Sequence, residues 1–341
     1  MKKVFLAVSF VVTGMMLLTA CAGFQPSGKV PSAPPAVEGG MTFITGGEQG
    51  TYYQYGLALA QVILETNDTA LNIVASDGSK ENVEALQSGS ALVGFAQSDV
   101  LSYAYEGTRI FDDKADKISI VAELYKEQVQ IITMNPAIRS VSDLKGKSVS
   151  IGANGSGVYF NAIDILEAYG LTEYDISPVY HNFGDSVNDL KNGKIDAAFV
   201  VAGAPTSAVS ALAATDDIYM ISLDEEHIDK LVSTSPHYSR ATISKRIYNT
   251  SGDINTVAVG AVLAASDDAS DEDVYNIVSA IFDNTDEFYA YGHIYEPCAW
   301  IDSEIELKEP VDEEKLSKAV SMAFLITHLF GSFFLRFQGY T

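Results

Sequence analysis

Basic residues are scarce in this chain. Its 341 residues include 21 lysines and arginines against 45 aspartates and glutamates, which gives a net charge of −24. Such a surface repels phosphate backbones and anionic headgroups, so the composition argues against nucleic acid and anionic lipid as partners of the folded body. We interpret the charge as a solvated acidic surface that keeps an exported protein soluble.

The sequence also lacks the usual patterns of catalytic and metal sites. No pair among its five histidines has metal-ligand spacing, and we expect His181, His227 and His237 at the surface. Gly155-Ser156-Gly157 lacks the residue between serine and glycine that a nucleophile elbow needs. The glycines of 46–50 lack the full Rossmann spacing, and neither glycine-rich segment carries a P-loop lysine. We therefore expect no catalysis, cofactor or metal, and a secreted α/β enzyme remains the alternative of another class.

Cysteine is nearly absent, and its first occurrence has a specific context. Residues 1–21 have two lysines, then an apolar core, 4–18, that is too short for a comfortable membrane span. The ending Leu18-Thr19-Ala20-Cys21 resembles the lipobox of bacterial lipoproteins. It predicts a cleaved signal peptide, a lipidated Cys21 and an extracytoplasmic, membrane-anchored protein; an ordinary secretory signal is the alternative. Cys298 would then remain a free thiol.

Four prolines among serines, glycines and alanines occupy residues 22–40, a composition typical of a flexible linker. The folded body is expected to follow directly. Its first stretch, 42–64, has a β-type run, then Gly46, Gly47 and Gly50, and then apolar residues at helical spacing. The N-terminus of such a helix presents bare N–H groups and a partial positive charge, so it accepts an anion without any lysine.

The same order of strand, glycine turn and helix recurs in residues 149–169. Each copy is followed by a shared pattern: Leu86, Gly89 and Phe95 match Leu190, Gly193 and Phe199, each pair 104 residues apart. The repeat indicates two α/β halves. Ligands of α/β folds bind at the carboxyl ends of strands, so we expect both glycine loops to face one shared cleft.

Further strand ends supply short polar side chains. Ser79, after the run 71–75, is interpreted as a helix N-cap, and Asn82 could face the cleft or serve only the cap. The run 91–96 ends at Gln97 and Ser98 before a helix that stops near Gly107.

The two halves are expected to be discontinuous in sequence. The buried run 129–134 predicts the first crossing between lobes, and the run 256–264 predicts the return. Residues 41–133 and 256–318 are therefore assigned to lobe I and 134–255 to lobe II. In lobe II the run 197–201 leads to Pro205 and Thr206, and Pro205 is expected in the first turn of a helix. Residues 271–282 are predicted to form a helix on lobe I.

The last residues, 319–341, are atypical. Residues 319–335 carry no formal charge, and the consecutive Phe333 and Phe334 cannot share one helix face. We predict that this tail is a frameshifted or truncated version of the native helix. A short membrane-active tail and a core helix are the alternatives, since the segment is barely long enough to span a bilayer.

Five segments together resemble one family, the TAXI-type extracytoplasmic solute receptors of TRAP transporters. The resemblance covers about residues 41–295, and the segments are GGEQGTYYQYG, GSKENVEALQSG, QSDVLSYAYEG, SVSDLKGKSVSIGANGSG and LKNGKIDAAFVVAGAPT. It implies a two-lobed periplasmic-binding-protein-like fold of type II. It also implies capture of a small carboxylate, of the glutamate or 2-oxoglutarate type, and delivery to an ion-gradient-driven TRAP membrane permease. The His-Pro-Gly-type ending of the family is absent here.

The ligand-binding residues that the resemblance implies lie in the loops described above. Their backbone N–H groups and hydroxyls would donate hydrogen bonds to a carboxylate, and aromatic rings would pack against the apolar part of the ligand. None of the five arginines lies in these loops, so no arginine clamp is expected. A receptor for an ATP-driven (ABC) importer is the alternative, because the fold is shared. The candidates are Gly47, Tyr52, Tyr53, Ser79, Asn82, Gln97, Ser98, Ser156, Gly157, Pro205 and Thr206.

Overall fold

The computed structural model describes residues 36–67 and 69–283. Within them, ten strands form one sheet in the order β2-β1-β3-β10-β4-β7-β5-β6, with β8 on β4 and β9 on β10. The strands are β1 (Met41–Ile44), β2 (Leu71–Val74), β3 (Val93–Gln97), β4 (Ile118–Thr133), β5 (Ser148–Ser150), β6 (Ser177–Val179), β7 (Ala197–Ala202), β8 (Tyr219–Met220), β9 (Ser239–Ile243) and β10 (Ile254–Ser266).

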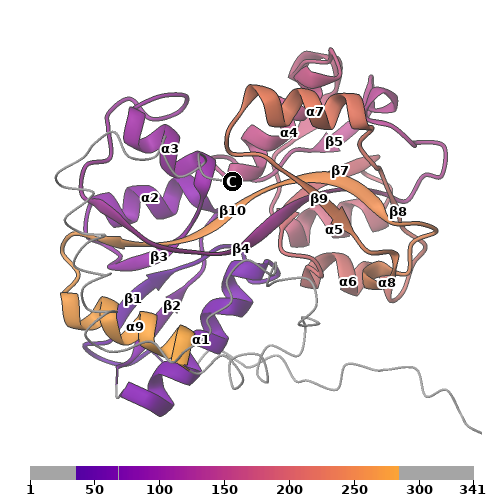
Figure 1. Cartoon of the computed structure of the whole chain (residues 1–341). Helices are drawn as coiled ribbons and strands as arrows, with labels where there is room; N and C mark the ends of the chain where they lie inside the picture. The colour runs from indigo at the N-terminus through magenta and orange to yellow at the C-terminus, as the bar shows by residue number, and fades with distance from the viewer. Residues whose placement is uncertain (1–35, 68, 284–341) are drawn as a thin grey trace, which may run out of the picture.

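The sheet has two parallel groups of strands, each with its own helices (Figure 1). β2, β1 and β3 form the first half, and β7, β5 and β6 form the second. Parallel strands require helical crossovers, which places helices around each group. The first half carries α1 (Thr51–Asn67), α2 (Ser79–Gln87), α3 (Ser98–Glu106) and α9 (Asp271–Asp283); the second carries α4 (Gly157–Ala168), α5 (Phe183–Lys191), α6 (Ser207–Ala213), α7 (Glu225–Thr234) and α8 (Lys245–Tyr248).

Two long antiparallel strands, β4 and β10, join the halves (Figure 1). β4 pairs with β10 over its residues 118–128 and with β7 over 128–133. β10 pairs with β9 over 254–258 and with β3 over 261–265. The connection between the halves therefore lies inside two paired strands rather than in loops.

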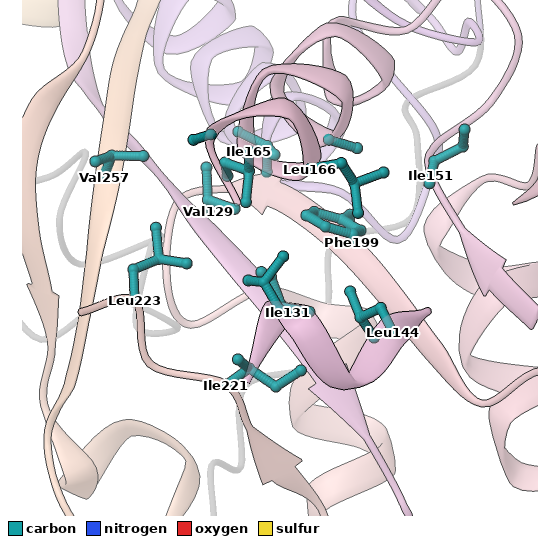
Figure 2. Close-up of a cluster of buried hydrophobic side chains, with 14 of the residues drawn as sticks. Val129, Ile131, Leu144, Ile151, Ile165, Leu166, Phe199, Ile221, Leu223 and Val257 are labelled. Carbon is teal, nitrogen blue, oxygen red and sulfur yellow. The ribbon is translucent and has the colours of Figure 1, made fainter. Parts of the chain in front are cut away.

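Each half has its own buried core. In the second half, Ile165 and Leu166 of α4 lie in one cluster with Val129 and Ile131 of β4 and Phe199 of β7 (Figure 2). All five side chains are almost fully buried. Burial of a side chain of this size contributes roughly 1.5–3 kcal/mol to the stability of the folded protein, so α4 is firmly packed against β4 and β7.

The internal repeat corresponds to equivalent pieces of the two halves. Gly89 follows α2 and Gly193 follows α5, both in the left-handed backbone region, with φ of 72° and 66°. This conformation at the end of a helix is the reason glycine is needed there. Phe95 of β3 and Phe199 of β7 are both fully buried. The predicted α/β fold in two similar halves is confirmed.

Several predicted boundaries differ from the structure. Ser79 is the first residue of α2, and Gly78 occupies the N-cap, with φ of 125°. Pro205 precedes α6 instead of lying in its first turn, because Thr206 is the N-cap. β4 begins at Ile118 rather than near residue 129, since its first part pairs with β10 and alternates buried with exposed positions that carry charges.

The positions at which β4 and β10 change their partner strands also lie inside the predicted lobe I. They occur near Gln128 in β4 and near Ala258 in β10, whereas the sequence suggested crossings after Thr133 and before Thr256. The predicted signal peptide, Cys21, Cys298 and the tail 319–341 lie outside the described residues, so those assignments stay predictions. Among the helices that the structure describes, none is long and apolar enough to cross a bilayer.

Candidate functional site in the cleft between the halves

A cavity of about 580 Å³ lies between the two halves, where the carboxyl ends of their strands meet. The first half lines it with the loops after β1 and β2, and the second half lines it with the loops that lead into α4 and α5. The lining residues include Gly47, Gly50, Thr51, Tyr52, Gly78, Ser79, Gln97, Glu127, Ser156, Gly157, Asn182 and Asp185.

Four helices begin at this cavity, and two of them have an uncompensated N-terminus. The first turn of α2 contains Glu81 and that of α5 contains Asp185, which offset the positive end of each helix. The first turns of α1 and α4 contain no acidic residue. Ser156, the N-cap of α4, makes no side-chain capping bond. The N–H groups at the starts of α1 and α4 are therefore the ones best placed to hold an anion.

Two buried polar atoms in the cavity wall, Oε1 of Gln97 and Oγ of Ser156, have no hydrogen-bond partner among the described residues. The hydroxyl of Tyr52, also in the wall, interacts with Glu127. Gln97 is 2 % exposed and Ser156 is 5 % exposed. The ring of Tyr52 stacks on Phe95 at a centroid distance of 4.9 Å, which fixes the direction of its hydroxyl. Unpaired buried polar atoms are costly, so their convergence on one cavity is typical of a ligand site.

Glu127 of β4 is the functional candidate that sequence reasoning missed. It lines the cavity, is 2 % exposed and accepts a hydrogen bond from Nε2 of Gln97 at 2.9 Å. Burial raises the pKa of Glu127 to about 8, although Tyr52 and Gln97 favour its charged form. The sequence contained a signal for Glu127, because the alternation along β4 puts it on the same buried face as Tyr125 and Val129.

The charged side chains in the described cavity wall are all acidic. Five carboxylates line it, and in the described part of the chain no lysine, arginine or histidine does. No group of three acidic, histidine or cysteine side chains within the described ranges is placed to hold a metal ion. The five are Glu48, Asp77, Glu81, Glu127 and Asp185.

The two halves are in contact across the mouth of the cavity. Oγ1 of Thr51 donates to the carbonyl of Gly203 at 3.1 Å, and N of Lys80 donates to the carbonyl of Gly155 at 3.2 Å. N of Ala208 also donates to the carbonyl of Gln49 at 3.3 Å. Each bond joins the start of a helix in one half to a loop of the other, so this is a closed arrangement.

The structure brings six of the eleven predicted residues together at the cavity: Gly47, Tyr52, Ser79, Gln97, Ser156 and Gly157. Ser79 also accepts a hydrogen bond from N of Gln97 at 3.1 Å, which links α2 to the end of β3. Tyr53, Asn82, Ser98, Pro205 and Thr206 do not line it.

The five that lie elsewhere have other surroundings. Asn82 is buried and donates to the carbonyls of Thr45 and Phe95, so it ties β1 to β3. Oγ of Ser98 accepts from N of Gly260 at 3.0 Å. Oγ1 of Thr206, in the loop with Pro205, donates to the carbonyl of Gly203 at 2.9 Å and also accepts from Nε2 of Gln130. Tyr53 is the next helix position after Tyr52 and therefore points away from it.

A polar cluster joins the halves beside the cavity. Asp99 of α3 is buried and accepts from Nδ2 of Asn161 of α4 at 3.0 Å. Tyr238 is the next member, since it accepts from Asn161 and donates to Asp164, each at 3.0 Å. Arg109 completes the cluster through an ion pair with Asp164 at 2.9 Å.

Comparison with known proteins gives one family and one fold. The profile of the NMT1-like family matches residues 43–300. A solved structure described as a periplasmic transporter is similar with a TM-score of 0.51 and 13% identity, covering 84% of this chain and 94% of that one. The alkanesulfonate-binding protein SsuA from Xanthomonas axonopodis pv. citri is similar with a TM-score of 0.47 and 17% identity, covering 88% and 95%. The fold is that of periplasmic solute-binding proteins.

Proposed function

Since the chain belongs to the NMT1-like family, we propose that it is an extracytoplasmic receptor that captures a small carboxylate between its halves. The ligand would be of the glutamate or 2-oxoglutarate type, and it would be delivered to a TRAP membrane permease. The protein would act by binding and closing, without catalysis and without a cofactor.

One observation carries the carboxylate assignment. The starts of α1 and α4 face the same cavity from opposite halves, and neither has an acidic residue in its first turn. A carboxylate between them would accept N–H bonds from both halves. Such a ligand would favour the closed arrangement because it contacts both sides at once.

The choice of transporter rests on the sequence. The five motif segments favour a TRAP permease, and an ATP-driven importer is the alternative partner because receptors of both classes share this fold. The neighbouring genes distinguish the two. A fused TRAP membrane subunit beside this gene supports the proposal, and an ATPase and permease pair in its place contradicts it.

A thermal-shift screen tests the binding function. The full chain, purified in a mild detergent, is screened against the protein amino acids and small organic acids. A ligand at 100 times its Kd stabilises the folded state by about 2.7 kcal/mol, which is visible as a rise in the melting temperature. Stabilisation by a small carboxylate is expected. No stabilisation by any carboxylate would contradict the proposal.

A further inference from the structure

The buried Glu127 suggests which class of carboxylate enters the cleft. We propose that Glu127 binds an ammonium group of the ligand, which makes the ligand an amino acid rather than an ammonium-free 2-oxo acid. The inference rests on the proposed function, because it names the ligand class of the same cavity.

The position of Glu127 fits a ligand whose two charges are close together. Tyr52 is the second residue of α1, and Gln97 donates to Glu127 while its Oε1 lies against Gly157 at the start of α4. Glu127 is therefore linked to the start of α1 through Tyr52 and to the start of α4 through Gln97. These are the two helix starts that we assign to the carboxylate of the ligand. An amino acid carries its carboxylate and its ammonium on one carbon atom, so it can contact both.

The acceptors around Glu127 match the donors of an ammonium group. An ammonium has three N–H donors and no acceptor. Besides the carboxylate of Glu127, Oε1 of Gln97 and Oγ of Ser156 are buried in the wall and have no partner within the described ranges. A 2-oxo acid has no donor for these oxygens.

Among the residues that the structure describes, no cation compensates the charge of Glu127. The groups that influence its ionisation are Tyr52, Gln97 and Asp99, and none of them is cationic. Four further carboxylates line the same cavity. A buried acid without a cation is unfavourable in the free protein, and a ligand cation would relieve that cost.

A protonated Glu127 could instead donate a hydrogen bond to an anionic or oxo ligand. The bond from Gln97 to Oε2 favours the carboxylate form but is compatible with either form, because a protonated carboxyl keeps an acceptor oxygen. The two arrangements predict opposite pH dependence, which makes them separable.

Binding an ammonium should release a proton. In the free protein the pKa of Glu127 is raised to about 8 by burial, so the acid is mostly protonated at pH 7. An ammonium requires the ionised form, so affinity should increase roughly tenfold per pH unit between pH 6 and pH 7.5. Asp99, which also influences the ionisation of Glu127, titrates in the same range because burial raises its pKa to about 7. Tyr52 stays neutral, since burial raises its pKa.

The experiment uses calorimetry on the full chain in detergent. A thermal-shift screen first compares amino acids with their 2-oxo analogues, L-glutamate and 2-oxoglutarate included. The best pair is then titrated at pH 7 in phosphate and in Tris, whose different ionisation heats reveal proton release. The variants are Glu127→Gln, Asp99→Asn and Glu123→Gln, the last an exposed acid on the same strand that pairs with Lys126.

We expect the amino acid to bind at least tenfold more tightly than its 2-oxo analogue, with release of nearly one proton. Glu127→Gln should abolish the release and the preference, while Glu123→Gln and Asp99→Asn retain both. Proton release is measured on the parent, so that result does not depend on the folding of a variant.

The failures are distinguishable. Equal or tighter binding of 2-oxo acids, no proton release, or an unchanged preference in Glu127→Gln overturns this inference but leaves a carboxylate receptor. Binding of neither class overturns the proposed function as well.

Discussion

Ser156 stands where the second half enters α4, and its hydroxyl is buried in the cavity wall without a partner in the described structure. A serine at an N-cap normally bonds to its own helix. Here the side chain leaves the helix start open, which is consistent with a group reserved for the ligand.

Ser156→Ala should weaken ligand binding by about ten- to a hundredfold, because a lost hydrogen bond to a charged group costs roughly 1.5–3 kcal/mol. Calorimetry with the tightest ligand of the thermal-shift screen measures the change. Ser233→Ala, at an exposed position of α7, is the control and should bind like the parent. Equal affinity of Ser156→Ala and the parent would remove Ser156 from the site.

Gly157 has a steric role that its neighbour lacks. A Cβ at this position would lie 1.8 Å from Oε1 of Gln97, so Gly157→Ala must displace a buried amide that bonds to Glu127. We expect a loss of affinity of about tenfold or more, because overpacking costs typically 1–3 kcal/mol.

The matched control is Gly252→Ala, since a Cβ there meets nothing within 4 Å. Both variants are compared by melting temperature without ligand and by Kd. If Gly157→Ala binds normally, the start of α4 is not in contact with the ligand.

At the scale of elements, closure depends on loops that reach across the cavity. Thr51 at the start of α1 donates to the carbonyl of Gly203 after β7. Thr51→Val keeps the shape and removes this bond, so the closed form should be less populated and affinity about two- to tenfold weaker, since a neutral hydrogen bond contributes roughly 0.5–1.5 kcal/mol.

Thr66→Val is the control for this change, because Thr66 lies in the same helix and its hydroxyl donates to the carbonyls of Val62 and Ile63 within that helix. Kd by calorimetry and the radius of gyration with and without ligand are the measurements. A Thr51→Val protein that closes and binds like Thr66→Val contradicts the role of this contact.

The contact between α3 and α4 should make stability depend on pH. Burial raises the pKa of Asp99 to about 7, although Asn161 and the N–H of Val100 favour the charged form. The unfolded chain has the ordinary value near 4, so the folded protein binds more protons between about pH 4 and pH 7. This group's contribution to stability therefore falls as pH rises through that window and is constant above it.

Asp99→Asn retains an acceptor for Asn161 and cannot titrate. The melting temperature of the parent, relative to that of the variant, should decrease from pH 5 to pH 8. Glu127 is present in both proteins, so only the part of its effect that depends on the charge of Asp99 enters the comparison. Parallel melting curves over this range would show that Asp99 does not titrate as assigned.

At the scale of the whole molecule, β4 and β10 are the strands of the described sheet that connect the two halves, and the cavity lies between the halves. This arrangement suits a receptor whose halves open and close about these two strands. A receptor for a membrane permease also benefits from an anchor.

We expect Cys21 to be lipidated and to be the first residue of the mature chain. Mass spectrometry of the protein isolated from membranes should find an N-terminal cysteine that carries lipid. An unmodified N-terminus downstream of Cys21 would contradict this prediction. The linker 22–40 then sets the distance between membrane and folded body.

The sequence determined the local parts of this protein. Gly89 and Gly193 mark helix ends, and the glycine turns before Thr51 and Gly157 mark helix starts, because these signals act through backbone conformation over a few residues. The six predicted residues that line the cavity follow from the same rule, since strand ends and helix starts meet at one edge of a sheet.

Tertiary structure decided which polar side chains face the ligand. Asn82 in α2 and Thr206 at the N-cap of α6 lie in segments as polar as those of Ser79 and Ser156, yet their side chains bond to the backbone of neighbouring strands and turns. In the sequence Glu127 is one charge among several in β4, and its burial and its interactions with Tyr52 and Gln97 arise only when β4 pairs with β10 in the folded protein. Burial and long-range partners depend on contacts between distant segments, so only the folded chain assigns them.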